Sequence, residues 1–368
     1  MAIFGRRANF IRPWQPMLLG AIAAIGLAIG SATGAEKVAF VYVTPLAPVG
    51  WSHQHDLGRL AMEKSLNGLV TTSFVDQVAE GADAERVIRQ LAQAGNRVIV
   101  TTSFGYMNAT ATVAGEFPKV SFLHVSGYRS NGTNLANYNG RYYEGRYLNG
   151  VIAGAMTKTN RIGFIAGYPI PEVVMGINAF MLGARRVNPK AEMRVVWLNS
   201  WYDPAREKAA GEALIAQGAD ILTNHSSSTA TVQTAEAHGI YAFSYSSDMA
   251  AYGPRAQLSG TVQLWGDYYS RAVRQIIEGK GMPKNIWGGM ADGMVALAPL
   301  NRAIPESVVR NVRQLQSAIV AGKLHPFAGE VRDQDGIVRI PAGKSPSDEE
   351  LNRMDYFVEG VTSAYPQP

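Results

Sequence analysis

The segment GWSHQHDLGR, residues 50–59, gathers residue types that could bind a metal or carry out acid–base chemistry. His53 and His55 are two residues apart, and Asp56 follows directly. Three such ligands and one open position are typical of a catalytic zinc site, and they would suit a metal-dependent hydrolase. The other four histidines are scattered and the sequence has no H-E-x-x-H motif. A metal or hydrolase site is therefore the weaker interpretation of this segment.

The same segment directly follows the first strand-like run of the chain, which favours a role in ligand contact. Trp51 offers an aromatic face, and Ser52 or His53 could reach the polar edge of a ligand. Asp56 is expected mainly to begin the helix that follows. We therefore predict that this segment forms one lip of a ligand-binding cleft.

Two further aromatic loops follow predicted strands. TTSFGYMN (101–108) places Ser103 and Phe104 after one strand, and NSWYDP (199–204) places Trp201 after another. Each aromatic residue could stack on a ligand or simply pack in the core with its polar atoms satisfied. We predict that Trp201 faces Trp51 across a cleft, with Phe104 in support.

Four more residues at similar places are candidates for contact with a ligand. Asp248 could accept a hydrogen bond from a ligand N–H, or it could cap the next segment. Glu172 and Asn178 lie at or near the start of a predicted helix, where an acidic residue also complements the helix dipole. Trp265 follows a later strand-like run. We predict binding roles for all four.

The elements that must position these residues alternate between strand-like and helix-like segments. This alternation is typical of β-α units, which build parallel sheets with right-handed crossovers. Ligands of such sheets bind beyond the carboxyl ends of the strands. The predicted strands are residues 37–43, 70–78, 96–102, 120–127, 161–167, 193–199, 219–225, 240–246 and 257–264. The predicted helices are 57–67, 83–95, 107–117, 142–157, 171–186, 203–218, a helix from about 228, one through 277, and 303–322.

The length and the restart of this pattern predict two α/β lobes of similar size. Residues 36–155, with about 257–285, are assigned to the first lobe. Residues 156–256, with part of 286–325, are assigned to the second lobe. A C-terminal hairpin around Asp335-Gly336 and a tail make up residues 326–368.

The first 35 residues have the layout of an export signal, with three arginines, an apolar run and a small-residue cleavage region. The Arg6-Arg7 pair leaves the Sec and twin-arginine routes both open. Removing this segment lowers the net charge from +5 to +2, and no basic stripe indicates nucleic acid. Because the chain has no cysteine, it has no site for a lipid anchor. We predict a soluble, non-lipidated periplasmic protein.

Nearly the whole mature chain resembles the basic membrane protein (BMP) family of ABC-transporter substrate-binding proteins, which is similar to purine nucleoside receptors. The motifs that carry the resemblance are GWSHQHDLGR, VAEGADAERVIRQLAQAG, TTSFGYM, YYEGRYLNGVIAG, PEVVMGINAFMLGARRVNP, WLNSWYDP, QGADILTNH and RDQDG. The resemblance implies a type I periplasmic binding protein fold, in which each lobe is a mostly parallel sheet flanked by helices. It also implies capture of a purine-type ligand and delivery to a membrane ABC permease complex.

The resemblance further implies that one aromatic ring from each lobe clamps the flat base, at the positions of Trp51 and Trp201. Nucleoside-binding members have an acidic residue shortly before the first aromatic, where this chain has APVG with Pro48. They also have a D-x-D pair where this chain has Ser246 and Asp248. The missing carboxylates argue against ribose, so we expect a free nucleobase such as adenine, guanine, hypoxanthine or xanthine.

The sequence has no G-x-S-x-G elbow, P-loop or zinc motif, so we predict a binding protein rather than an enzyme, without a cofactor or metal. We expect a monomer that binds no nucleic acid. A purine nucleoside-binding or a sugar-binding protein of the same class remains an alternative. An exported metal-dependent hydrolase is the third possibility.

Overall fold

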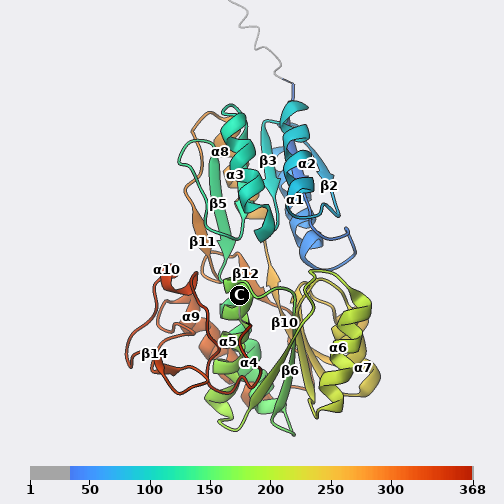
Figure 1. The fold of residues 1–368 in the computed structure, drawn as a ribbon, viewed down its shortest axis with the longest axis vertical. Coiled ribbons are helices and arrows are strands. Elements are labelled where there is room, and N and C mark those ends of the chain that lie inside the picture. The colour runs from blue at the N-terminus through green and yellow to red at the C-terminus, as the bar shows by residue number, and fades with distance from the viewer. Residues whose placement is uncertain (1–33, 367–368) are drawn as a thin grey trace, which may run out of the picture. The chain divides into compact units, whose positions relative to one another are not determined.

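The computed structural model describes residues 34–366, and both large sheets belong to one structural unit that starts at Ala35 (Figure 1). The predicted export signal therefore lies outside the described residues, apart from its last two positions. Within the described part of the chain, no helix has the length and apolar character needed to cross a membrane.

The first lobe is built on a six-stranded sheet in which all neighbouring strands run parallel. Its strands are β1 (Glu36–Val41), β2 (Val70–Val75), β3 (Val98–Thr101), β4 (Ser121–Val125), β5 (Leu135–Gly140) and β11 (Ile286–Gly288), in the spatial order β11-β5-β4-β3-β1-β2. The helices that cover this sheet are α1 (Trp51–Leu66), α2 (Ala82–Gln93), α3 (Met107–Glu116) and α8 (Gly266–Ile277), with a short 3-10 turn η1 (Phe104–Tyr106). Helix α1 packs beside α8, and α2 packs beside α3.

The second lobe repeats this plan with one antiparallel edge strand. Its strands are β6 (Arg161–Ala166), β7 (Glu192–Trp197), β8 (Ile221–His225), β9 (Tyr241–Ser246), β10 (Gln257–Gln263) and the antiparallel β12 (Val295–Leu297), in the order β12-β10-β9-β8-β6-β7. Its helices are α4 (Tyr142–Met156), α5 (Pro171–Val187), α6 (Pro204–Ala216), α7 (Ala230–His238) and α9 (Glu306–Val320), with the 3-10 turn η2 (Ala250–Tyr252). Helix α4 packs on α5, and α6 packs on α7.

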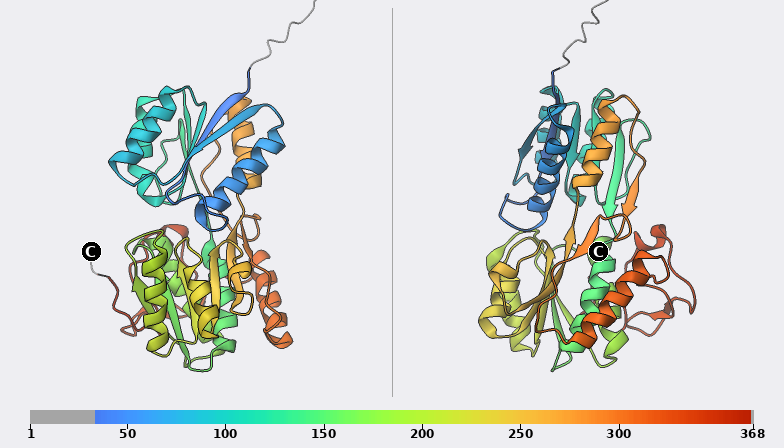
Figure 2. Two further views of the ribbon diagram at one scale, coloured as in Figure 1. Left: turned by 90° about the vertical axis from the view of Figure 1, so that its right-hand side faces the viewer. Right: turned by 180° about the vertical axis from the view of Figure 1, so that it is seen from behind.

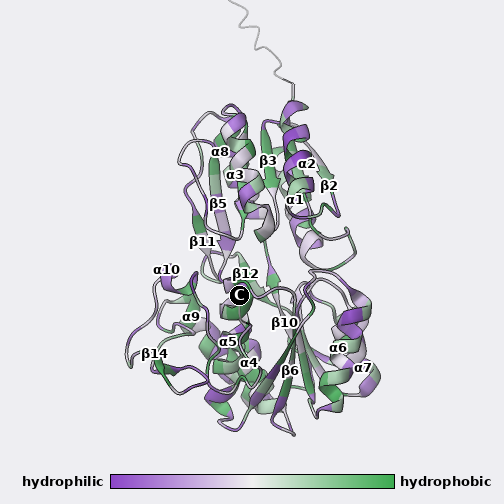
Figure 3. Ribbon diagram, viewed as in Figure 1, coloured by the Kyte–Doolittle hydropathy of each residue, from purple (hydrophilic) through white to green (hydrophobic). Residues whose placement is uncertain are grey.

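Helices cover both faces of each sheet, as the two views in Figure 2 show. Strands that are covered on both faces read as continuous apolar runs, because no side of them meets water. The β3 sequence VIVT and the β4 sequence SFLHV are buried at every position. The hydropathy colouring of Figure 3 shows the apolar character of the strands in both lobes. These features confirm the predicted two-lobe α/β fold.

The chain passes between the two sheets three times, and the predicted lobe boundaries differ from the observed ones at these crossings. Helix α4 follows β5 but packs in the second lobe, against α5 and β10. Strand β10 also belongs to the second sheet, and the chain returns to the first lobe with α8 and β11. The predicted boundaries at residues 155 and 257 therefore fall one element away from the observed crossings. Apolar spacing identifies an element but does not say which of two similar sheets it joins.

The C-terminal segment packs on the second lobe. Strands β13 (Val331–Arg332) and β14 (Val338–Ile340) form the predicted hairpin, and a short helix α10 (Asp348–Leu351) follows it. The tail then runs beside β7, where Met193 and Val361 form an isolated bridge.

Candidate ligand-binding site

A cavity of about 390 Å³, counting its mouth, lies between the two sheets. Most of the lining residues stand at or just beyond the carboxyl ends of parallel strands, where α/β sheets bind ligands. The lining residues are Val43, Trp51, Ser103, Phe104 and Ser126 from the first lobe, and Ile170, Glu172, Trp201, His225, Ser226, Ser227 and Tyr245 from the second.

Trp51 reaches the cavity because α1 begins there, five residues before the predicted start at Asp56. The N-cap is Gly50, whose φ of 100° suits glycine, and a Cβ at this position would lie 2.6 Å from the carbonyl oxygen of Ser227 in the other lobe. Asp56 therefore does not begin the helix. Its carboxylate instead accepts hydrogen bonds from Tyr42 Oη at 3.1 Å and Arg59 Nε at 2.6 Å.

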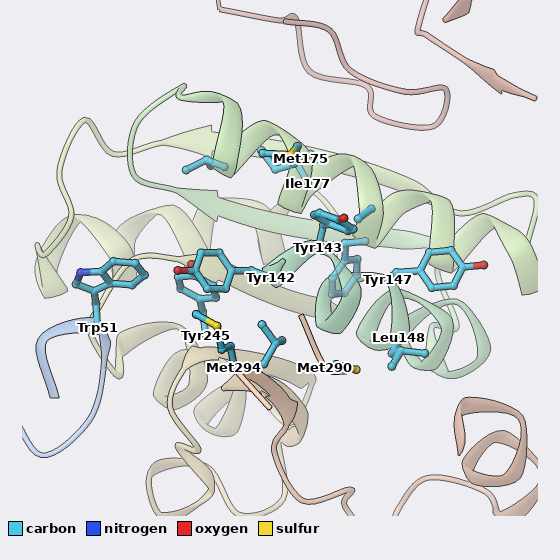
Figure 4. Close-up of a cluster of buried hydrophobic side chains, with 14 of the residues drawn as sticks. Trp51, Tyr142, Tyr143, Tyr147, Leu148, Met175, Ile177, Tyr245, Met290 and Met294 are labelled. Atoms are coloured by element: carbon cyan, nitrogen blue, oxygen red, sulfur yellow. The ribbon is translucent and has the colours of Figure 1, made fainter. Parts of the chain in front are cut away.

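The indole of Trp51 is fixed by its own lobe and by aromatic neighbours. Its Nε1 donates to the carbonyl oxygen of Thr102 at 2.6 Å. The rings of His55, Tyr142 and Trp265 meet it edge-on, with centroid separations of 4.7, 6.0 and 6.5 Å. Figure 4 shows Trp51 facing Tyr142 and, beside it, Tyr245. Trp51 is thus a buried wall whose orientation is already set.

Trp201 forms part of the opposite side of the cavity and is only partly buried. Its ring lies against Gly167, where a Cβ would come within 2.6 Å of the indole, and the Tyr168 ring meets it at a centroid separation of 4.9 Å. Asp203 caps α6 and accepts a hydrogen bond from the Arg206 backbone N–H at 3.0 Å. The loop that carries Trp201 is therefore held at both ends by local structure.

Glu80, an exposed residue of the first lobe, joins the two sides of the cavity. Its Oε1 accepts a hydrogen bond from Trp201 Nε1 at 3.0 Å and another from the Gly105 backbone N–H at 3.2 Å. The hydroxyl of Ser103 donates to the same oxygen. One carboxylate thus connects the Ser103 loop of the first lobe with the half-buried tryptophan of the second.

Other hydrogen bonds also cross between the lobes. Ser126 Oγ donates to Glu172 Oε2 at 2.8 Å. Ser247 Oγ accepts hydrogen bonds from the Gly50 backbone N–H at 2.8 Å and from Gln54 Nε2 at 3.0 Å. These contacts hold the lobes together around the cavity.

The polar part of the cavity is built around Glu172, whose side chain is 10% exposed. His225 Nε2 lies 3.6 Å from Glu172 Oε1. Burial lowers the pKa of His225 to about 4, although the neighbouring Glu172 works in the opposite direction, so the ring is neutral at pH 7. Buried Arg146 lies behind it, with its guanidinium over the Tyr245 ring at 4.2 Å.

Half of the ten predicted ligand-binding residues line the cavity. They are Trp51, Ser103, Phe104, Glu172 and Trp201. The structure therefore brings residues of both lobes together at one cavity.

The other five predicted residues lie elsewhere. Ser52 Oγ bonds to Thr44 at the base of the β1–α1 loop, and His53 is half-buried on α1 outside the lining. Trp265 is fully buried and stacks on His55 at 4.9 Å, so it packs behind Trp51 instead of facing a ligand.

Asn178 and Asp248 have structural roles that the sequence pattern does not reveal. Asn178 is buried on α5, where its amide donates to the Tyr356 carbonyl and accepts from the Val358 N–H, thereby tying down the C-terminal tail. Asp248 is exposed, and its carboxylate accepts from Gln257 Nε2 at 2.6 Å and from the Ala250 N–H at 3.0 Å. Of the two roles that the sequence leaves open for Asp248, ligand contact and capping of the next segment, the bond to the Ala250 N–H corresponds to the second.

The residues of the histidine motif have separate partners in the structure. His55 is buried and its Nδ1 lies 2.6 Å from the Tyr269 hydroxyl, while Asp56 bonds to other partners. None of the three residues His53, His55 and Asp56 lines the cavity. Within residues 34–366, no group of three or more potential metal ligands comes together.

Sequence reasoning missed several lining residues, most clearly His225 and Tyr245. They occupy the end of β8 and the penultimate position of β9, so the rule about carboxyl ends of strands could have found them. Glu80 gave no such signal, because its contact with Trp201 depends on how the two lobes meet.

A comparison with known protein families agrees with this fold and this cavity. Residues 35–325 match the model of the Bmp family, described as ABC transporter substrate-binding protein PnrA-like. The chain belongs to the Bmp family. The resemblance found in the sequence is thereby confirmed.

Curated relatives of this Bmp protein include binding proteins with different named ligands. A purine-binding protein of Brucella abortus is 44% identical over 95% of this chain and 100% of the relative. A putative ABC transporter glucose-binding protein of Haloferax volcanii is 36% identical over 90% of this chain and 81% of the relative. An ABC transporter nucleoside-binding protein of Lactococcus lactis is 28% identical over 35% of this chain.

Solved structures agree on the fold of the Bmp chain. An ABC transporter solute-binding protein from Aeropyrum pernix superposes with a TM-score of 0.69 at 17% identity, covering 86% of this chain and 98% of that one. As a Bmp member, the chain is an ABC transporter substrate-binding protein, which binds a small molecule and works with a membrane transporter. Binding of a small molecule for transport is therefore the role of its family.

Proposed function

We propose that the protein captures a free purine base in the periplasm and delivers it to a membrane ABC permease. The observation that carries this proposal is the pair of tryptophans, Trp51 and Trp201, which reach one cavity from opposite lobes. A purine has a flat π face that stacks on aromatic rings and a polar edge that needs a few placed partners. Phe104 supports the aromatic side, and Ser103 and Glu172 supply polar groups.

The sequence relatives support a purine more strongly than other ligands. The purine-binding protein of Brucella abortus shares 44% identity over almost the whole chain, the highest of the three relatives described above. The motif with Trp51 and the motif with Trp201 both fall within the aligned family region, residues 35–325.

The carboxylates near the cavity favour a base over a nucleoside. A ribose ring is commonly held by a carboxylate that accepts from two hydroxyl groups. Glu172 is the one acidic residue in the cavity lining, and Asp248 is occupied by Gln257 and its own helical turn. Pro48 and Ser246 stand where nucleoside-binding members of the resembling family carry acidic residues, so two carboxylates that would support ribose binding are absent from these positions.

A sugar is the second candidate, because the relative from Haloferax volcanii is named a putative glucose-binding protein. Aromatic rings also stack on sugar rings. Sugars, however, expose hydroxyl groups on every edge, whereas the lining has large apolar walls from Trp51, Phe104 and Trp201.

Thermal unfolding with a ligand panel tests the proposal, since binding raises stability by mass action. We expect adenine, guanine, hypoxanthine or xanthine to raise the Tm and to bind in calorimetry. Adenosine and inosine should bind more weakly than the best base, and glucose should have no effect. Tighter binding of a nucleoside or of glucose would overturn the choice of a free base. Size-exclusion chromatography checks the expected monomer.

A further inference from the structure

Glu172 is the one acidic side chain in the cavity lining. An ionised carboxylate has about four lone-pair sites for hydrogen bonds. Among the described side chains, only Ser126 donates to it within hydrogen-bonding distance, through the bond to Oε2. Glu172 is therefore a buried acceptor with unused capacity that faces the ligand space.

Two buried groups, His225 and Arg146, lie beside and behind this carboxylate. His225 Nε2 faces Oε1 at 3.6 Å, while His225 Nδ1 and Arg146 Nε have no hydrogen-bond partner in the described part of the protein. Both of these unpaired atoms point to the region of Gly176, on the helix that carries Glu172. The buried guanidinium contributes a positive charge behind the site.

A buried carboxylate that lacks donors discriminates strongly between ligand groups. An amino group presents N–H donors to it, whereas an oxo group presents lone pairs that repel it. Adenine and hypoxanthine differ in this way at one ring position, and guanine and xanthine differ at another. The carboxylate also disfavours anions, so phosphorylated purines fit poorly.

Building on the proposed function, we infer that Glu172 is a specificity-determining residue that accepts a hydrogen bond from the exocyclic amino group of an aminopurine. The site then selects adenine over hypoxanthine or guanine over xanthine. The pair that shows the selection identifies which edge of the base meets Glu172. The rings of Trp51 and Trp201 can stack on any base and therefore supply affinity. The carboxylate of Glu172 accepts from only some bases and therefore supplies selectivity.

Calorimetry with these two matched ligand pairs tests the inference, at a pH where all four bases are neutral. In the native protein, the amino member of at least one pair should bind about tenfold to a hundredfold more tightly than its oxo partner. Glu172→Gln should reduce that ratio to near one, because the amide can turn its N–H toward an oxo group. Glu306→Gln is the matched control, because it makes the same carboxylate-to-amide change at an exposed position of α9, outside the cavity lining, and it should keep the ratio.

Equal or tighter binding of the oxo member in both pairs would overturn the inference, even if Glu172→Gln did not fold. A ratio that survives in a folded Glu172→Gln variant would overturn it too. If none of the four bases binds the native protein, the proposed function itself fails, and this outcome is visible before any variant is made.

Discussion

The two tryptophans that face the cavity are held in opposite ways. Trp51 is buried, bonded to Thr102 of its own lobe and enclosed by aromatic rings. Trp201 is half-exposed, and its indole nitrogen bonds to Glu80 of the other lobe. The first wall is part of a core, whereas the second depends on contact between the lobes.

This difference suggests how the site works. A wall built into a core is preorganised, so little entropy is lost there when a ligand binds. Trp201, by contrast, bonds through its indole nitrogen to Glu80 of the other lobe. This bond can form only when the lobes are together, as in hinge closure around a ligand. Trp51 should therefore affect both stability and binding, and Trp201 should affect mainly binding.

The largest effect is expected for Trp51→Ala. Removing this ring leaves a hole among His55, Tyr142 and Trp265, so we expect a loss of about 3–5 kcal/mol in the free energy of unfolding. Binding of the ligand should be lost as well. Urea denaturation and calorimetry measure the two effects. Trp51→Phe, which keeps a ring, should retain most of the stability; an unchanged free energy of unfolding in Trp51→Ala would show that this wall is not part of the core.

Trp201→Ala should separate binding from stability. Loss of one stacking surface should weaken binding by about 1–3 kcal/mol. The ligand-free protein should lose less than about 1 kcal/mol of stability, because the ring is partly exposed. Trp201→Phe keeps the stacking face and should retain most of the affinity. If Trp201→Ala bound purines like the native protein, this residue would not be a wall of the site.

His55 lies beside Trp51 and His225 lies near Trp201. The lowered pKa values of these two histidines predict that the stability of the protein depends on pH. Burial lowers the pKa of His225, near Trp201, from the usual 6.5 to about 4, and it also lowers the pKa of His55 beside Trp51. Between pH 6.5 and 4 the unfolded chain binds protons that the folded protein does not, so stability should fall as the pH falls through this window. For His225 we expect a contribution on the order of 2 kcal/mol.

Urea denaturation of the native protein and of His225→Gln across this pH range measures that contribution. The variant should lose less stability on acidification than the native protein, because one titrating group has been removed. Since His55 and His124 are also buried with lowered pKa values, part of the pH dependence should remain. Parallel curves for the two proteins would mean that His225 does not titrate in this way.

The sequence predicted the part of the site that follows from strand order. Trp51, Phe104 and Trp201 all follow strands, and parallel strands bring their carboxyl ends to one edge of each sheet. That rule needs only the alternation of strands and helices. It placed these aromatic residues near one another without any knowledge of how the lobes pack.

The parts that were missed depend on tertiary packing. Asn178 has the position of a helix-start residue in the sequence, but the C-terminal tail, which is far away in the chain, takes its amide. Trp265 follows a strand, yet its ring stacks inward on His55. Glu80 lies in the loop between β2 and α2, and only the meeting of the two lobes gives it Trp201 as a partner. Local pattern therefore predicts which edge carries the site but not which side chains turn toward it.

The smallest effect is expected for Glu80→Ala. This variant tests directly whether Trp201, unlike Trp51, depends on a bond to the other lobe. Loss of the bond to Trp201 should raise the rate of ligand release by about two- to tenfold, in line with a net hydrogen-bond contribution of about 0.5–1.5 kcal/mol. The association rate should change little, since the bond forms only as the lobes close. Stopped-flow tryptophan fluorescence measures both rates. Asp83→Ala, which removes an exposed acidic residue from the nearby helix α2, should leave them unchanged. If Glu80→Ala released the ligand at the native rate, Gly167 and Tyr168 alone would hold Trp201, and the second wall would be as preorganised as the first.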